Sequence, residues 1–253
     1  MRGYLTLKFK AMTPRQMIEA IITHYGILQN VHHDFQDRHG LIRKSNSVIA
    51  SFLEDIVAAY VFDFFHDHDI PVEIWVDQIF SFGVNQKFKP DITIIDTRDG
   101  TFEIIGFIEV KDSANPFRWK NAAGNNNRSI EYINNRITKL ATIKNEHDFT
   151  INYKNHDLDE NIDIIIGENT KIDLVLISDQ LFSLENHARL REYCDSAEVS
   201  PRLNLHILLS RMHPNPRINN QGVNAQDLLD ILREDQILFE SFDQRLAEIA
   251  QIA

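Results

Sequence analysis

Three residues near the middle of the chain have side chains suited to metal-dependent hydrolysis. Asp91 opens one apolar run, and Glu109 and Lys111 stand two apart at the end of another, IIGFIEVK. Two carboxylates held close together raise each other's pKa unless a cation lies between them, and hard oxygen ligands suit Mg²⁺. A lysine beside them could orient a water and offset charge on a phosphoryl oxygen. The set therefore predicts metal-dependent phosphodiester hydrolysis.

Two strands joined by a tight turn must position these residues. Residues 91–96 (DITIID) and 101–111 (TFEIIGFIEVK) have β-strand patterns, and an Asp-Gly pair between them favours a hairpin. Alternation puts Glu109 and Lys111 on one face. A three-residue turn places Asp91 opposite Glu109, and a two-residue turn shifts the pair by one. Either turn brings the three side chains to the same end of the sheet.

The remaining elements predict an α/β fold with a mixed central β-sheet flanked by helices. Apolar spacing indicates the helices, runs of apolar and β-branched residues the strands, and polar stretches the loops. We expect helices at residues 13–28, 45–65, 128–144, 184–194 and, once or twice, within 225–249; strands at 72–80, 171–178 and 203–210; and loops at 29–44, 81–89 and 121–127.

The spacing of the motif resembles that of a known family. Pro90-Asp91, seventeen intervening residues and then Glu109-Val110-Lys111 are similar to the signature of the PD-(D/E)XK nuclease superfamily, over roughly residues 45–178. The resemblance implies a restriction-endonuclease-like core. In it, Asp91 and Glu109 would bind the metal with the Val110 carbonyl, and Lys111 would position the attacking water.

A helix that precedes the hairpin often supplies a further acid in this superfamily. Glu54, in the stretch SFLEDIVAAYVF, matches that position and is a candidate metal ligand, although the neighbouring Asp55 competes for the role. A solvated acid on the flank of an amphipathic helix is the alternative interpretation of either residue.

The resemblance is greatest to type II restriction endonucleases. It implies Mg²⁺ as cofactor, with Mn²⁺ as a substitute, and site-specific cleavage of double-stranded DNA by a homodimer that leaves 5'-phosphate ends and needs no nucleotide cofactor. Two alternatives share the same core residues: a DNA repair or recombination nuclease of the superfamily, and a catalytically inactive relative that binds DNA. The intact Asp91, Glu109 and Lys111 count against an inactive relative.

Basic, amide, hydroxyl and aromatic side chains lie close to the motif in sequence, on either side of it, and could contact phosphates and base edges. The residues expected to contact DNA are Lys87, Lys89, Ser113, Asn115, Arg118, Trp119, Lys120, Asn125 and Arg128. The histidine pairs lack the spacing of a helical zinc site, so we expect surface positions for them. His206, inside an apolar strand, is expected to be a hydrogen-bonded core residue.

Composition and charge restrict the remaining possibilities. At 253 residues with 43% hydrophobic residues, the chain is expected to form one nuclease domain, with a catalytic core at about residues 45–180 and a C-terminal part, 181–253, that completes the sheet and adds helices. The net charge of −11 argues against a nucleic-acid partner, but residues 111–144 carry a net +5. A single cysteine and no apolar run of membrane length predict a cytoplasmic protein without a membrane partner.

Overall fold

Two long helices lie in the first part of the chain. The computed structural model describes residues 11–28, 47–82, 86–100, 102–112, 149–151, 164–178, 192, 195, 203–209, 212–216, 223–232 and 237–251. Helix α1 (Pro14–Leu28) starts with a capping box, because Gln16 N–H donates to Thr13 Oγ1 (3.2 Å) and Thr13 N–H donates to Gln16 Oε1 (2.9 Å). Helix α3 (Ser47–Asp67) buries one side of its surface against the sheet. Both predicted helices are confirmed over the described residues.

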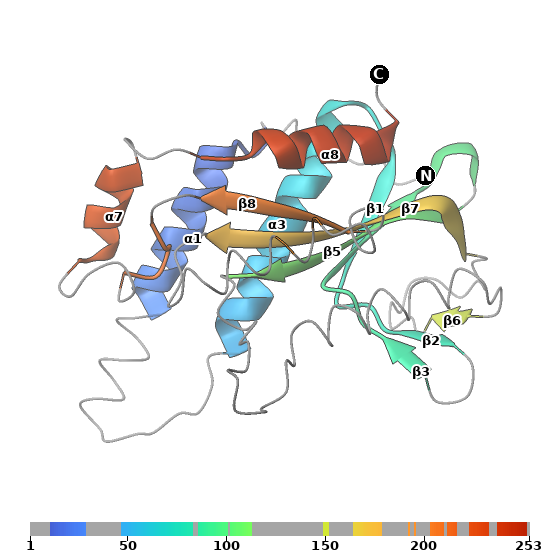
Figure 1. The fold of residues 1–253 in the computed structure, drawn as a ribbon, viewed down its shortest axis with the longest axis horizontal. Helices are drawn as coiled ribbons and strands as arrows, with labels where there is room; N and C mark the ends of the chain where they lie inside the picture. The colour runs from blue at the N-terminus through green and yellow to red at the C-terminus, as the bar shows by residue number, and fades with distance from the viewer. Residues whose placement is uncertain are drawn as a thin grey trace, which may run out of the picture.

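A five-stranded mixed sheet forms the centre of the fold (Figure 1). Its order is β1-β4-β5-β7-β8, formed by β1 (Val72–Val76), β4 (Ile92–Asp96), β5 (Phe102–Lys111), β7 (Ile164–Ser178) and β8 (Leu203–Leu209). The pairs β1–β4 and β4–β5 are antiparallel, whereas β5–β7 and β7–β8 are parallel. A mixed α/β sheet flanked by helices is therefore confirmed.

The central hairpin has the register predicted for a three-residue turn at the end that carries Asp91 and Glu109. Ile92 pairs with Ile108 and Thr93 with Phe107, so the same register carried one residue further places Asp91 opposite Glu109. A bulge between Ile94 and Ile95 shifts the pairing by one toward the turn. The turn is a short 3-10 helix, Arg98–Gly100, that ends on Gly100 with φ 73°, a conformation that glycine adopts without strain.

A second, smaller sheet includes residues from the end of the predicted strand 72–80 and from the predicted loop 81–89. The prediction was therefore wrong for these residues. Strand β1 ends at Val76, and β2 (Phe80–Phe82) pairs with both β3 (Gln86–Phe88) and β6 (Phe149–Ile151). Phe80 and Phe88 both pack edge to face on Phe107 of β5, with ring centroids 5.9 and 5.4 Å away. These aromatic contacts between distant parts of the chain stabilise two strands that the largely polar local sequence does not predict.

The two faces of the main sheet carry different layers. Side chains of α1, α3 and the C-terminal helices α7 (Ala225–Leu232) and α8 (Glu240–Ala250) share one core cluster with one face of the strands. Phe80, Phe88 and Phe107 belong to a separate cluster. The two described C-terminal helices agree with the prediction of one or two helices there.

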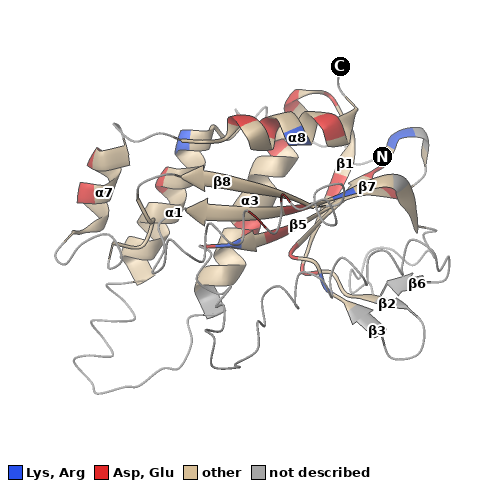
Figure 2. Cartoon of the chain, viewed as in Figure 1, with Lys and Arg blue, Asp and Glu red and all other residues tan. Residues whose placement is uncertain are grey.

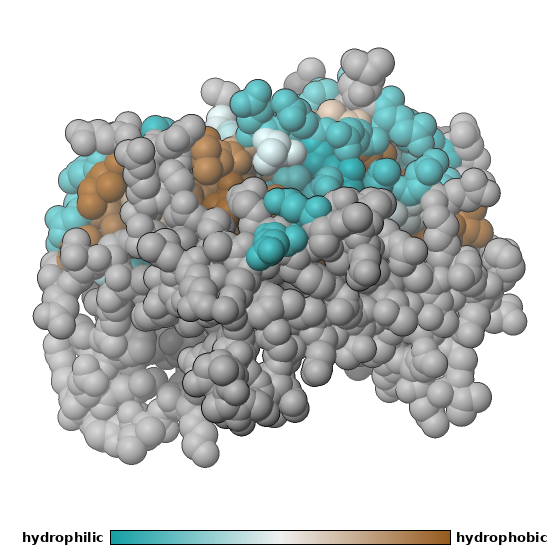
Figure 3. Space-filling model, in the orientation of Figure 1, coloured by the Kyte–Doolittle hydropathy of each residue, from teal (hydrophilic) through white to brown (hydrophobic). Residues whose placement is uncertain are grey.

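The exposed positions of the C-terminal helices are mostly polar, with Ile231 of α7 as an exposed apolar residue. Figure 2 shows acidic residues on α7 and α8, and Figure 3 shows a hydrophilic surface where α8 lies. The inner side of α8 is apolar, with Phe242, Leu246 and Ile249 buried. Among the described helices, none is long and apolar enough to cross a membrane.

A buried polar network fastens α8 to the parallel strands. Asp173 of β7 is fully buried, and one of its oxygens, Oδ1, accepts from Arg245 Nε (3.0 Å) and lies 2.9 Å from His206 Nε2. The predicted role of His206 as a hydrogen-bonded core residue is confirmed.

Three predicted segments lie outside the described residues: 29–44, 121–144, and all of 184–194 except Glu192.

Candidate functional site

Asp91 links the two hairpin strands at the site by hydrogen bonds. It follows Pro90, directly precedes β4 and is buried, with 7% of its surface exposed. Its Oδ2 atom accepts a hydrogen bond from the backbone N–H of Val110 (2.8 Å) and another from the Lys111 ammonium (3.0 Å). The hairpin therefore places Asp91 beside the second strand, as the register argument predicts.

Glu109 and Lys111 form the second part of the site. The Lys111 ammonium lies 2.6 Å from Glu109 Oε1 and donates to the Val110 carbonyl at 2.8 Å. Burial lowers the pKa of Lys111, but the charges and hydrogen bonds of Glu109 and Asp91 outweigh burial and raise it above its ordinary value. Lys111 is therefore a fixed positive charge between two carboxylates.

Helix α3 contributes Glu54 to the same place. One carboxylate oxygen each from Glu54, Asp77 and Asp91 lie within 4.8 Å of one another, a spacing that would allow them to hold a metal ion. Burial, with the nearby charges of Asp91 and Asp77, raises the pKa of Glu54 to about 7, although Lys111 and Lys89 act in the opposite direction.

The structure also separates Glu54 from its competitor. Asp55, the next residue on α3, is exposed, while Glu54 is partly buried and turned toward the acidic cluster. Neighbouring residues on an α-helix point about 100° apart, so only one of the two can face the sheet end.

Asp77 is the site residue that the sequence does not reveal. It directly follows β1 and adopts φ 59°, and its backbone N–H donates to the Asp91 carbonyl (3.0 Å). Its carboxylate forms an ion pair with Lys89 at 2.7 Å. An acid at the end of the apolar run VEIWV is a signal in the sequence, but the strand predicted over residues 72–80 places Asp77 in its interior, whereas β1 ends at Val76.

Charge and ligand type together fit a hard divalent cation. If all are ionised, the four carboxylates of Glu54, Asp77, Asp91 and Glu109 carry −4, and the two lysines Lys89 and Lys111 carry +2, which leaves −2. Oxygen ligands from three separate elements, partly withdrawn from water, are the donor set that Mg²⁺ or Ca²⁺ prefers. The ligand group found among the described residues is Glu54, Asp77 and Asp91, and Glu109 lies beside it through Lys111.

Most residues expected to contact DNA lie outside the part of the chain that the structure describes. These are Ser113, Asn115, Arg118, Trp119, Lys120, Asn125 and Arg128. Lys87 belongs to β3. Lys89 is exposed, and its ammonium lies on Asp77 at the edge of the acidic site.

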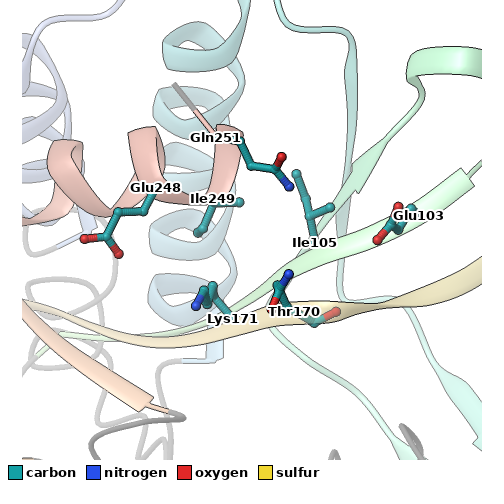
Figure 4. A pocket seen from close by; sticks show the side chains of 8 residues that line it. Glu103, Ile105, Thr170, Lys171, Glu248, Ile249 and Gln251 are labelled. Atoms are coloured by element: carbon teal, nitrogen blue, oxygen red, sulfur yellow. The ribbon is translucent and has the colours of Figure 1, made fainter. Parts of the chain in front are cut away.

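A separate hollow of about 290 Å³ lies between β5, β7 and α8 (Figure 4). Its lining includes Glu103 and Ile105 from β5, Lys171 from β7 and Glu248 from α8. Glu248 is already paired with Arg245 at 2.6 Å. None of the residues predicted for catalysis or metal binding lines this hollow.

Comparison with known proteins leaves the site to be interpreted from its own geometry. No family model, no curated protein and no solved structure matches this chain.

Proposed function

We propose that this protein is a Mg²⁺-dependent endonuclease that hydrolyses DNA phosphodiester bonds. The observation that supports the proposal most is the convergence of Glu54, Asp77 and Asp91 at the sheet end, where Lys111 links Asp91 to Glu109. A surface Glu-x-Lys pair would not need a buried aspartate from another strand beside it. Here Asp91 is buried and bonded to both the backbone and the lysine of the second strand.

Each residue has a task in this proposal. Glu54, Asp77 and Asp91 would hold the cation, with Glu109 and the Val110 carbonyl as further oxygen donors next to Lys111. The bound Mg²⁺ would supply Lewis-acid stabilisation of charge on the phosphate.

The Lys111 ammonium would orient the attacking water and stabilise negative charge as it forms. Its raised pKa keeps it protonated at neutral pH, so it would act as a charge and hydrogen-bond donor and not as a base. Asp91 and Glu109 hold it in one place, because both accept from or pair with the same nitrogen.

The order of elements also supports a restriction-endonuclease-like core. A helix that supplies an acid, an antiparallel hairpin that supplies Asp91 and the Glu109-x-Lys111 pair, and parallel strands after it occur in that order here. In its finer form, we propose a cytoplasmic type II restriction enzyme that cuts double-stranded DNA at a specific site as a homodimer and leaves 5'-phosphate ends. Mn²⁺ is expected to replace Mg²⁺.

The test is cleavage of phage DNA with Mg²⁺, Mn²⁺ or EDTA. Discrete fragments would support site-specific cleavage, and a smear would indicate a nuclease without strict specificity, as expected of a repair or recombination enzyme.

Asp91→Asn and Lys111→Met are expected to lower the cleavage rate at least about a hundredfold. Asp69→Asn, at an exposed turn, is the control and should cut normally. Folded variants are identified by unchanged thermal melting. No cleavage of any DNA by wild type with either metal would refute the enzyme, and a fully active folded Asp91→Asn would refute the site.

A further inference from the structure

A large bulge in the parallel pairing of β5 and β7 opens the hollow between these strands and α8 (Figure 4). Residues 167–170 of β7 lie opposite the single residue Ile105 of β5, and regular pairing resumes at Lys171. The Thr170 hydroxyl donates to the Ile104 carbonyl at 2.7 Å and so ties the bulge to β5. Bulges are common beside functional sites, because they change the direction in which side chains point.

Two opposite charges line this hollow and do not pair with each other. Glu103 of β5 and Lys171 of β7 are both partly buried, and neither forms an ion pair or a side-chain hydrogen bond within the part of the chain that the structure describes. The Glu103 carboxylate lies against the backbone of Gly167, where a Cβ atom would collide with it. Partly buried charges without partners cost free energy, and a ligand with the opposite charges offsets that cost.

The two charges come from different points along the strands. Lys171 pairs with Gly106, three positions after Glu103, so the two residues are separated by roughly 10 Å along the strand direction. Ile105 lies between these positions on β5, and Ile249 of α8 adds a second apolar side chain to the lining (Figure 4). A volume of about 290 Å³ is at the small end for a ligand pocket, so the hollow suits a small molecule.

This lining is complementary to a small molecule with two opposite charges and an apolar middle. A carboxylate would pair with Lys171, an ammonium group would pair with Glu103, and a short hydrocarbon chain would cover Ile105. Glu248 also lines the hollow, but it is paired with Arg245 at 2.6 Å. We propose that the hollow binds a small aminocarboxylate whose ammonium and carboxylate groups are separated by a short hydrocarbon chain.

The hollow is separate from the acidic site. Glu103 and Ile105 belong to the first half of β5, whereas Glu109 and Lys111 lie at its end. None of the acids that could hold a metal ion lines the hollow. The proposed binding therefore does not depend on the nuclease function.

The test uses ligands that carry both charges or one of them. In NMR chemical-shift titrations of the whole chain, ε-aminocaproate should bind with a Kd of about 1 mM or tighter. Caproate lacks the ammonium group and hexylamine lacks the carboxylate, so each should bind at least about tenfold more weakly. These comparisons separate recognition of both charges from simple burial of a hydrocarbon chain.

Variants of the two charged residues place the ligand in the hollow. Lys171→Gln and Glu103→Gln should each weaken ε-aminocaproate binding at least about tenfold. Lys171→Gln should change hexylamine binding less than about twofold, because hexylamine has no carboxylate for Lys171 to bind. Glu240→Gln removes an exposed acid at the start of α8 and is the control that should bind like wild type. Unchanged thermal melting identifies the folded variants.

Three results would overturn the proposal. Absence of ε-aminocaproate binding up to about 10 mM would refute an aminocarboxylate site. Equal binding of ε-aminocaproate, caproate and hexylamine would refute recognition of the two charges. Wild-type affinity in folded Lys171→Gln and Glu103→Gln would show that the ligand binds elsewhere. Each of these results leaves the test of DNA cleavage unaffected.

Discussion

At the scale of single residues, the position of Glu54 in the fold changes the pKa of its carboxyl group. It lies on α3 beside an exposed acid of the same helix, yet its own side chain turns toward Asp77 and Asp91. Burial and those two charges raise the pKa of Glu54 to about 7, so in the absence of metal it is only partly ionised at neutral pH. A cation bound between these acids would draw it fully into the charged form.

The matching prediction compares Glu54→Gln with Asp55→Asn. The amide introduced by Glu54→Gln keeps the size of the side chain but removes a charged ligand, so Ca²⁺ affinity measured by calorimetry should fall about tenfold or more. Cleavage with Mg²⁺ should fall with it. Asp55→Asn changes an exposed neighbour on the same helix and should leave both unaffected. Equal behaviour of the two variants would exclude Glu54 as a ligand.

His213 provides a prediction for pH. Burial lowers its pKa from 6.5 to about 4, and its Nδ1 accepts from the Asn215 N–H at 3.0 Å, as a neutral ring does. The unfolded chain binds a proton below pH 6.5, but the folded chain does not until about pH 4. The contribution to stability is therefore complete above about pH 6.5 and is lost as pH falls toward about 4, by up to about 3 kcal/mol.

Urea unfolding between about pH 7 and pH 4 measures this effect. His213→Gln should show a smaller loss of unfolding free energy over that range than wild type, whatever its stability at neutral pH. His66→Gln, which removes an exposed histidine, should keep the wild-type slope. An unchanged slope in His213→Gln would show that this residue does not govern the pH dependence.

At the scale of elements, close contacts between helices decide which small residues can be replaced. Helices α1 and α7 approach so closely that a Cβ atom at Gly26 would lie 2.5 Å from the Cβ of Ala225. Such a distance is too short for two carbons, so one of the helices would have to move. Gly26 is thus needed for the approach of α7, not for a special backbone angle.

Gly26→Ala is accordingly expected to destabilise the protein. The strain of overpacking, about 1 to 3 kcal/mol, should exceed the gain in helix propensity of up to about 1 kcal/mol. Adding Ala225→Gly should restore most of the loss, because it removes the atom that clashes. Chemical denaturation of both single variants and the double variant measures this. No rescue by Ala225→Gly would mean that the two positions do not meet in the way described.

At the scale of the whole molecule, the Asp173–Arg245 pair joins the C-terminal helix to the parallel half of the sheet. Asp173 is fully buried, and Arg245 Nε donates to it at 3.0 Å across 72 positions of sequence. The rest of the guanidinium reaches Glu248 at 2.6 Å near the surface of α8. Such a pair stabilises the fold mainly by leaving no unpaired charge inside it.

Arg245→Met should therefore lower the free energy of unfolding by about 3 to 5 kcal/mol, because it leaves Asp173 without its cationic partner. Asp173→Asn together with Arg245→Met should be less damaging than Arg245→Met alone. Glu248→Gln, which removes the exposed partner, should cost no more than about 1 kcal/mol. Thermal and chemical unfolding distinguish these cases. A double variant as unstable as the single one would rule out a buried unpaired charge as the cause.

Local pattern was sufficient for much of the fold and for part of the site. Apolar spacing predicted α1, α3 and the parallel strands, and the Asp-Gly turn with strand alternation predicted that Asp91, Glu109 and Lys111 would meet. These predictions succeed because helix and strand periodicities and hairpin register are set by neighbouring residues.

Tertiary structure alone decided the remainder. Strands β2 and β3 form because Phe80 and Phe88 pack on Phe107, a contact that no short stretch of sequence contains. Asp77 joins Glu54 and Asp91 because the end of β1 lies beside the start of β4, and that position also brings it to Lys89. Which acid of α3 faces the site likewise depends on how the helix packs on the sheet. Pairings of this kind depend on distant parts of the chain being brought together, so a one-dimensional pattern does not contain them.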